Sequence, residues 1–360
     1  MAADECVEDK SGKSTFGLAY FFSSIVGKTI ASISFVHVSI LSVEKKDSYS
    51  FSCSQILRKK HLKKEKVKKK KRARGRPKGS KNKKNSINYT QSLTLVEKAL
   101  SKMKGLCHLF LKDIKFNYFV GDGAYGNKNW TWMLAKFDLK LISKLHYNAA
   151  LYSPYSGLYS GKGRPRKYGK KLDTHQLSAK FLVHTNDDKK KKYIEYIYQM
   201  ELLSKKFKDK LNIVILVKEN RKTKKRRHSI LFSNDLKLSF EKIIAYYSLR
   251  FQIEFNFRDA KQFFGLNDFK NIKQTQVENA INLSLFMSLL SKILLKKYRL
   301  FYQNENLSIN DLKSIFRAKM YVKLIVNNSS NLDLNNFNSD LSELNLDTIL
   351  NHGIINAKAA

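Results

Sequence analysis

Residues 247–261 read YSLRFQIEFNFRDAK, and the interpretation of the whole chain starts from this stretch. On a helix, which turns about 100° per residue, four of its polar side chains fall within an arc of about 60°. They are Tyr247, Arg250, Glu254 and Lys261. The phenylalanines between them can pack the helix onto a sheet while this polar stripe faces a cleft. A solvated face with an Arg–Glu pair at i, i+4 is the plainer interpretation, so the stripe needs support from elsewhere.

A second acidic position follows a short apolar run. Asp122, in YFVGDGAYG, follows residues 116–120 after a single glycine, and those residues are typical of a buried strand. An Asp-Gly turn is the alternative. The 132 residues that separate Asp122 from Glu254 hold four strand-like segments with charged turns between them. These cover residues 179–184, 193–200, 211–218 and 227–233.

The remaining periodicity predicts a mixed α/β fold. Further strands are expected at 17–25, 29–43, 49–54 and 140–144, and helices at 89–104, 127–137, 240–264, 275–299 and 309–320. Strands and helices that alternate in this way form a mixed sheet flanked by helices. The strand-like segments after residue 151 are then a β-rich insertion into that sheet.

The charge indicates a polyanionic partner. The 360 residues carry a formal net charge of +39, which favours nucleic acid binding. Residues 58–84 hold 17 Lys or Arg against one acid, so this run should be a solvated, disordered insertion. It accounts for +16 of the total, and the other residues still carry +23. The folded part is therefore basic too.

Several function classes are excluded by the sequence. Three distant cysteines provide neither a disulfide framework nor a zinc site, which favours a reduced, intracellular protein. The first ten residues lack the pattern of a signal peptide. The apolar stretches around 35–43 and 283–295 are short or broken by Ser and Lys, so no membrane span is expected.

Within the basic run, the segment RGRPK places Arg74 and Arg76 as in an AT-hook core. Such a segment lies in the narrow minor groove of A·T-rich DNA, where arginine is favoured. General attraction of lysines to phosphate explains the run equally well.

The spacing Y-x2-R-x3-E-x6-K in residues 247–261 resembles the signature of bacterial insertion-sequence DDE transposases at every position. The resemblance implies a ribonuclease-H-like fold in which a β-rich insertion separates the second and third catalytic acids. Asp122 and Glu254 match those two acids. The first maps onto Asp4 in ADECVEDKSGK, with Asp9 as the alternative.

The resemblance also implies the chemistry. Two Mg²⁺ ions, or Mn²⁺ in their place, bind such carboxylates and promote phosphodiester hydrolysis and strand transfer on double-stranded DNA. Arg250 and Lys261 are then expected beside phosphates, and Tyr247 on a phosphate or a displaced base. The loop GRPRKYG, with Arg164, Arg166 and Lys167, resembles a DNA-contacting loop of these enzymes. Such transposases act as dimers on paired DNA ends, and this one is expected in the bacterial cytoplasm, at the nucleoid.

The expected domain organisation follows from these features. Residues 1–57 and 85–150 form the first part of the catalytic domain, interrupted by the basic insertion 58–84. Residues 151–236 form the β-rich insertion and 237–300 the helical remainder that carries Glu254. Residues 301–360 form an Asn-rich tail.

One feature disagrees with the family pattern. Only three residues precede Asp4, so the central strand that should hold it is expected to be largely missing, which indicates a truncated copy with impaired activity. The alternative functions are a non-catalytic DNA-binding protein and, less well supported, a basic RNA-associated protein. The second leaves the polar stripe of residues 247–261 without a role.

Overall fold

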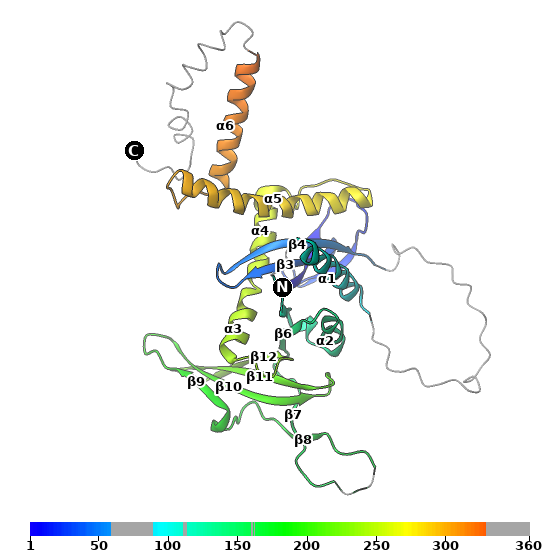
Figure 1. Ribbon diagram of the computed structural model, residues 1–360, viewed down its shortest axis with the longest axis vertical. Coiled ribbons are helices and arrows are strands. Elements are labelled where there is room, and N and C mark those ends of the chain that lie inside the picture. The colour runs from blue at the N-terminus through cyan, green and yellow to red at the C-terminus, as the bar shows by residue number, and fades with distance from the viewer. Residues whose placement is uncertain (59–88, 111–113, 160, 162, 329–360) are drawn as a thin grey trace, which may run out of the picture. The chain divides into compact units, whose positions relative to one another are not determined.

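The computed structural model describes residues 1–58, 89–110, 114–159, 161 and 163–328 (Figure 1). The AT-hook-like Arg74 and Arg76, nearly all of the basic run and most of the C-terminal tail lie outside these residues. The chain divides into two compact units. The first contains Met1–Glu254 and Ile272–Gln274, and the second contains Phe255–Asn271 and the described part of Thr275–Ala360.

A twelve-stranded sheet forms the body of the first unit. Its strands are β1 (Ala2–Asp9), β2 (Ala19–Ser23), β3 (Lys28–Ser42), β4 (Asp47–Ile56), β5 (Tyr118–Val120), β6 (Lys140–Leu145), β7 (Leu151–Pro154), β8 (Tyr168–Lys171), β9 (Leu182–Asn186), β10 (Tyr193–Ser204), β11 (Lys210–Asn220) and β12 (Arg226–Ser233). Their order is β2-β3-β1-β5-β6-β12-β11-β10-β7-β8, with β4 beside β3 and β9 beside β10. The β1–β5 and β5–β6 pairs are parallel and the others antiparallel, which confirms the mixed sheet.

Helices cover this sheet and complete its core. They are α1 (Gln91–Phe110), α2 (Lys128–Ala135) and α3 (Phe240–Leu249), with short 3₁₀ turns η1 (Gly123–Tyr125) and η2 (Ala179–Phe181). Leu93 of α1 and Met133 of α2 are buried in one cluster with Phe119, Leu141 and Phe232 from three neighbouring strands. Burial of such large side chains is the main stabilising term of the fold.

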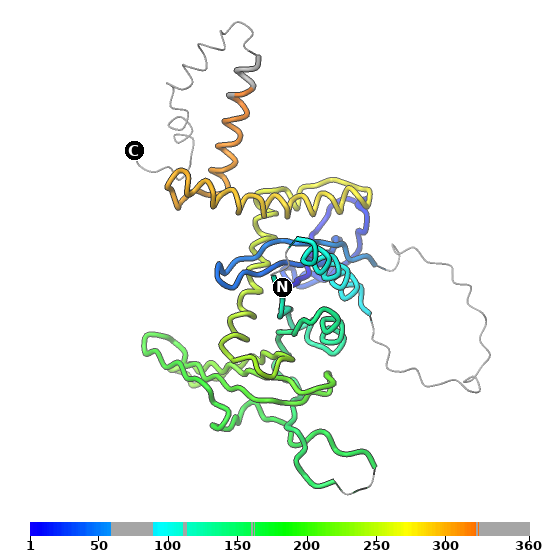
Figure 2. Tube along the Cα trace, in the orientation of Figure 1, coloured from blue at the N-terminus to red at the C-terminus, as the bar shows by residue number. Residues whose placement is uncertain are grey.

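The predicted β-rich segment forms strands, and they join the same sheet. Strand β12 pairs with β6, so β7–β12 extend the sheet beyond β6. In Figure 2 the traces of β10 and β11 run side by side along a long hairpin. The chain after β6 therefore adds strands to the sheet that carries Asp122.

Two predictions about the elements were wrong. The first strand is present, because residues Ala2–Asp9 form β1 between β3 and β5. The predicted helix 240–264 is interrupted between α3 and α4 (Gln252–Phe264). At the break, the Arg250 N–H donates to the Tyr247 carbonyl over 3.2 Å and the Glu254 N–H donates to the Phe251 carbonyl over 3.1 Å. These i→i−3 bonds tighten one turn to 3₁₀ geometry, so a constant 100° per residue does not hold across it.

The second unit is helical in its described part. It contains most of α4, α5 (Gln274–Phe301) from Thr275 onward, and α6 (Ile309–Asn328). Ser284 of α5 donates to the Phe264 carbonyl over 2.8 Å, and Lys292 donates to Asn256 Oδ1 over the same distance. Both bonds hold α5 to α4.

Helix α5 differs from the sequence-based expectation about membranes. Among the described residues it is the one helix that is long and apolar enough to span a bilayer, with a mean hydropathy of 1.2 over its best 18-residue window. One third of that window is buried in the protein. Core helices of soluble proteins have the same length and composition, so this property alone is weak evidence for a membrane span.

Candidate active site

The first two predicted acids lie close together, Asp4 in strand β1 and Asp122 in the turn after strand β5. Parallel strands β1 and β5 pair with Ala2 opposite Val120, and the Val120 N–H donates to the Met1 carbonyl over 2.8 Å. Asp4 and Asp122 each follow this pair by two residues. They therefore lie at one level and, because side chains alternate along a strand, on one face. Neighbouring strands are about 4.8 Å apart, so the two carboxylates are close neighbours.

Asp122 is fixed by the turn that follows β5. Its Oδ1 accepts a hydrogen bond of 2.9 Å from the Ala124 N–H and caps η1. Ser143 of β6 donates from its hydroxyl to the Asp122 carbonyl over 2.5 Å. The Asp-Gly turn considered from the sequence is thus present, and it orients the carboxylate.

Gly121 is required by this turn. A Cβ atom at Gly121 would lie 2.6 Å from both Cβ and Cγ of the buried Tyr125. We expect Gly121→Ala to lower the free energy of unfolding by about 1–3 kcal/mol through overpacking. Gly105→Ala is the matched control, because no atom lies within 4 Å of its added Cβ and alanine favours helix α1. Urea unfolding midpoints compare the two, and a Gly121→Ala midpoint equal to that of the unsubstituted chain would contradict this packing.

Arg250 connects the first and third acids. It follows the last residue of α3, and its Nη1 lies 2.7 Å from Asp4 Oδ2. Its Nη2 lies 3.5 Å from Glu254 Oε1. The side chains of Arg250 and Asp4 are 17% and 18% exposed, whereas that of Glu254 is 45% exposed. The bond to Asp4 is therefore partly shielded from water, and Glu254 remains accessible.

The acids influence one another electrostatically. Burial raises the pKa of the Asp4 carboxyl to about 6, Arg250 opposes the rise, and the charges of Asp122 and Glu254 add to it. Burial also raises the pKa of Tyr247, while Arg250 lowers it and Asp122 raises it. Residues whose pKa values are shifted by burial and by neighbouring charges are common at functional sites. The three predicted acids, Arg250 and Tyr247 thus form one cluster.

The donor set of this cluster fits a hard divalent cation in kind. Asp4 of β1 and Asp122 of the turn after β5 offer carboxylate oxygens, which are the ligands that Mg²⁺ prefers. Within the described residues, however, no group of three or more His, Cys, Asp or Glu side chains is arranged to hold a metal ion. Arg250 supplies the positive charge between Asp4 and Glu254 instead. The structure thus brings the three acids together and leaves the predicted ion site unassembled.

The remaining predicted contacts come from other elements than β1 and the turn after β5. Lys261 is half-buried on α4, within the second compact unit. Arg164, Arg166 and Lys167 are exposed between β7 and β8, and β8 is six strands from β5 in the sheet order. There the Arg166 guanidinium lies 5.0 Å from the centre of the Tyr155 ring. This basic loop does not belong to the acid cluster.

Other residues near the site were not found from the sequence. Ser143 and Lys144 of β6 lie beside the Asp122 turn. The hydroxyl of the buried Tyr125 has no hydrogen-bond partner among the described residues. The charges of Glu5 and Asp4 act on this hydroxyl. Burial, followed by those charges, raises the pKa of Tyr125 well above its ordinary value. The predicted strand at 140–144 was the available signal, since consecutive strands often pair.

A comparison with protein families agrees with this cluster. A family model described as DDE superfamily endonuclease matches residues 1–197. The chain belongs to this family. A search of curated proteins finds no match to the chain.

Membership of the DDE superfamily endonucleases implies a nuclease or transposase with DNA as its substrate, and enzymes of this superfamily generally use divalent metal ions. The matched residues include Asp4 and Asp122 and end before Glu254. The place of Glu254 in the site therefore rests on its contact with Arg250 and on its charge acting on Asp4.

Proposed function

We propose that this endonuclease-family chain is an insertion-sequence transposase. It would hydrolyse DNA phosphodiesters at the ends of a transposon and join the freed strand to target DNA. The observation that carries the proposal is that Asp4 of β1 lies close to Asp122, in the turn after the adjacent parallel strand β5, with Arg250 linking Asp4 to Glu254. The signature spacing in residues 247–261 supports it.

In this proposal the acid cluster holds the metal. Asp4 and Asp122 would hold two Mg²⁺ ions, which Mn²⁺ could replace, and Glu254 would complete one site. When bound, such ions would supply activation of the attacking water or 3′ hydroxyl and stabilisation of the leaving oxygen. Glu254 is suited to its role because its side chain, unlike that of Asp4, remains nearly half exposed.

The cationic and phenolic residues would position the substrate. Arg250 holds the Asp4 carboxylate at 2.7 Å and favours its ionised form. With its second Nη group directed to the exposed Glu254, the same guanidinium can bind a phosphate beside the scissile bond. Tyr247 and Lys261 are proposed as further contacts to the DNA. A dimer on paired ends and a location at the bacterial nucleoid also belong to this proposal.

Nicking of a labelled DNA duplex tests the proposal. We expect wild-type protein to nick it with Mg²⁺ or Mn²⁺ and Glu254→Gln to lower the rate about 100-fold or more, which corresponds to about 3 kcal/mol of transition-state stabilisation. Glu241→Gln is the control, because Glu241 is an exposed acid in the first turn of α3. Equal rates for wild type and Glu254→Gln would show that Glu254 has no role in the reaction.

A non-catalytic DNA-binding protein is the second candidate. Two observations favour it, namely the charge of +23 outside the basic run and the contact of Arg250 with Asp4, which neutralises an acid that metal binding requires. Absence of nicking in every variant, together with salt-sensitive binding to DNA, would select this function.

A further inference from the structure

Exposed cations continue the row of acids across the sheet. Lys144 of β6, Arg227 of β12 and Lys218 of β11 form what we call the basic strip, and all three side chains are exposed. None of them belongs to the family signature or to the basic loop between β7 and β8. The strip lies entirely within the first compact unit.

Strand register places Lys144 next to Asp122. Val120 of β5 pairs with Ile142 of the parallel strand β6. Two residues further on, Asp122, in the turn that follows β5, therefore lies near the level of Lys144. The strand spacing of about 4.8 Å makes this lysine a close neighbour of the acid pair.

The same register places Arg227 further along this face. Lys144 pairs with Leu231 of β12, and Arg227 precedes Leu231 by four residues, or about 14 Å of strand. Strand β12 is two strands from β5 in the sheet order, or about 10 Å. On a flat sheet Arg227 thus lies about 17 Å from Asp122, which is the length of about five DNA base pairs. Directly opposite Arg227, β11 contributes Lys218.

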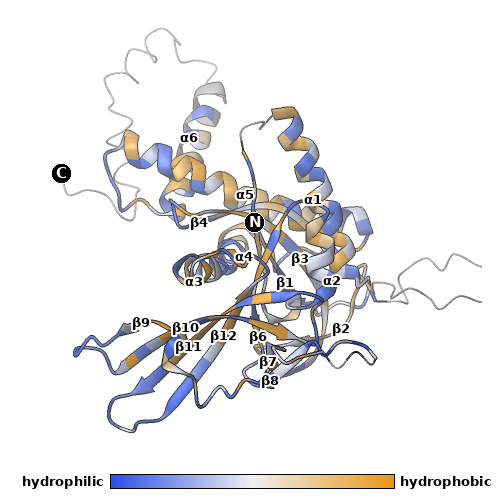
Figure 3. Cartoon of the chain, turned by 60° about the horizontal axis from the view of Figure 1, so that its bottom comes forward, coloured by the Kyte–Doolittle hydropathy of each residue, from blue (hydrophilic) through white to orange (hydrophobic). Residues whose placement is uncertain are grey.

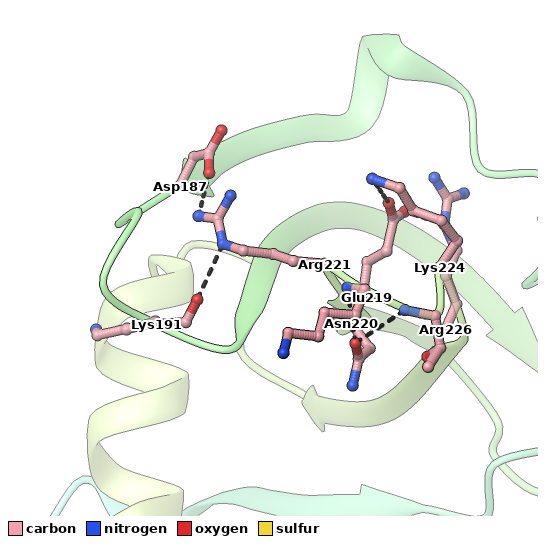
Figure 4. A network of polar contacts seen from close by, with 9 residues as sticks. Asp187, Lys191, Glu219, Asn220, Arg221, Lys224 and Arg226 are labelled. Carbon is pink, nitrogen blue, oxygen red and sulfur yellow. Dashed lines mark hydrogen bonds and ion pairs between the residues drawn. The ribbon is translucent and has the colours of Figure 1, made fainter.

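Glu219 neutralises cations on the other face. Arg226 precedes Arg227, points to the opposite face and lies 2.6 Å from Glu219 Oε2, while Lys224 lies 3.9 Å from the same carboxylate (Figure 4). Figure 3 shows that the outer ends of β11 and β12 are hydrophilic and that their inner parts are hydrophobic. The polar ends of these strands thus project beyond the core.

Two charges of one sign stand opposite each other in the strip. Lys218 and Arg227 form a cross-strand pair, and like charges in this position destabilise a sheet. Lys218 is compensated by Glu195 Oε1 at 2.8 Å, whereas no ion pair is recorded for Arg227 or Lys144 within the described residues. The charges of Arg227 and Lys144 are therefore available to an anionic ligand on this face.

We propose that the basic strip binds the phosphate backbone of duplex DNA and guides the duplex from the acid pair towards the outer end of the β11–β12 hairpin. The inference deepens the proposed function, because it assumes that the bound DNA is the duplex whose phosphodiester faces Asp4 and Asp122. Lys144 contacts the backbone near the scissile bond, and Arg227 contacts it about half a helical turn away.

The salt dependence of DNA binding tests this proposal. Anisotropy of a fluorescent duplex is measured in EDTA at several salt concentrations, with Glu254→Gln as the parent so that no cleavage occurs. Each lost phosphate contact reduces the slope of log K against log salt by about 0.9. We expect the double substitution Lys144→Gln/Arg227→Gln to reduce it by about 1.8. Arg226→Gln, beside Arg227 on the same strand, should leave the slope unchanged.

A charge-preserving variant separates binding from folding. Lys144→Arg/Arg227→Lys should keep the parent slope, and circular dichroism should give folded spectra for every variant. An unchanged slope for Lys144→Gln/Arg227→Gln, or an equal reduction of the slope by Arg226→Gln, would contradict DNA binding by the basic strip. Nicking by the wild type is measured separately with Mg²⁺. If DNA binding depends on Lys144 and Arg227 but no nicking occurs, the transposase proposal is refuted while DNA binding by the basic strip is supported.

Discussion

Asp4→Asn and Asp122→Asn are each expected to lower metal-dependent nicking of duplex DNA about 1000-fold, while Asp9→Asn leaves it nearly unchanged. Each Asn keeps the size of the side chain and removes one anionic ligand. Loss of the charge stabilisation that a bound divalent ion provides costs about 4 kcal/mol in the transition state. Initial rates with Mg²⁺ and with Mn²⁺ measure the effect.

Asp9 is a stringent control because it lies on the same strand as Asp4. It is the last residue of β1, exposed, and five residues from Asp4. Five residues span about 17 Å and reverse the direction of the side chain, so Asp9 faces away from Asp122. If Asp9→Asn stops nicking and Asp4→Asn does not, the first acid has been assigned to the wrong residue.

Much of the fold could be predicted because the local patterns are strong. The alternating and apolar runs gave the positions of β2–β6 and of β9–β12, and helical periodicity gave α1, α2, α5 and α6. Asp122 was recognisable because it follows an apolar strand after a single glycine. Arg250 and Glu254 could be paired because residues four apart on a helix are neighbours.

The missed features depend on contacts between distant residues. β1 reads AADECVED, with four acids in eight residues, so nothing local marks it as a strand. It forms because Ala2 and Ala3 are fully buried between β3 and β5, the latter more than a hundred residues away. The placement of Lys144 beside Asp122 likewise follows from the register of β5 with β6, which no local pattern specifies.

Arg250 illustrates why the site required the structure as well as the motif. A continuous helix would place Arg250 and Glu254 on one stripe. The 3₁₀ turn between α3 and α4 changes the direction of these side chains relative to the sheet. In the folded chain Arg250 bonds to Asp4, which lies 246 residues away. The motif therefore identified the residues, while the sheet determined which acid is buried with the guanidinium.

The buried Asp4 carboxyl should make stability depend on pH. Its pKa rises from 3.8 to about 6 on folding, chiefly because of burial. Between about pH 4 and pH 6 the folded protein therefore keeps a proton that the unfolded chain has released, so the contribution of Asp4 to stability is lost as pH rises through this window. We expect wild type to lose about 2 kcal/mol relative to Asp4→Asn between pH 4 and pH 7.

Urea unfolding of both proteins in EDTA at pH 4, 5, 6 and 7 measures this difference, because effects of the other titrating groups largely cancel in the comparison. Arg250→Met provides a second test. Arg250 lowers the pKa of Asp4, so its removal should raise that pKa further and move the loss of stability to higher pH. A difference that stays constant from pH 4 to pH 7, or a wild type that loses stability relative to Asp4→Asn as pH falls, would mean that the Asp4 carboxylate is not buried among Arg250, Asp122 and Glu254. Such a result would also remove the structural basis of the acid cluster, since burial of Asp4 depends on the packing of α3 and the following turn against the β1–β5 pair.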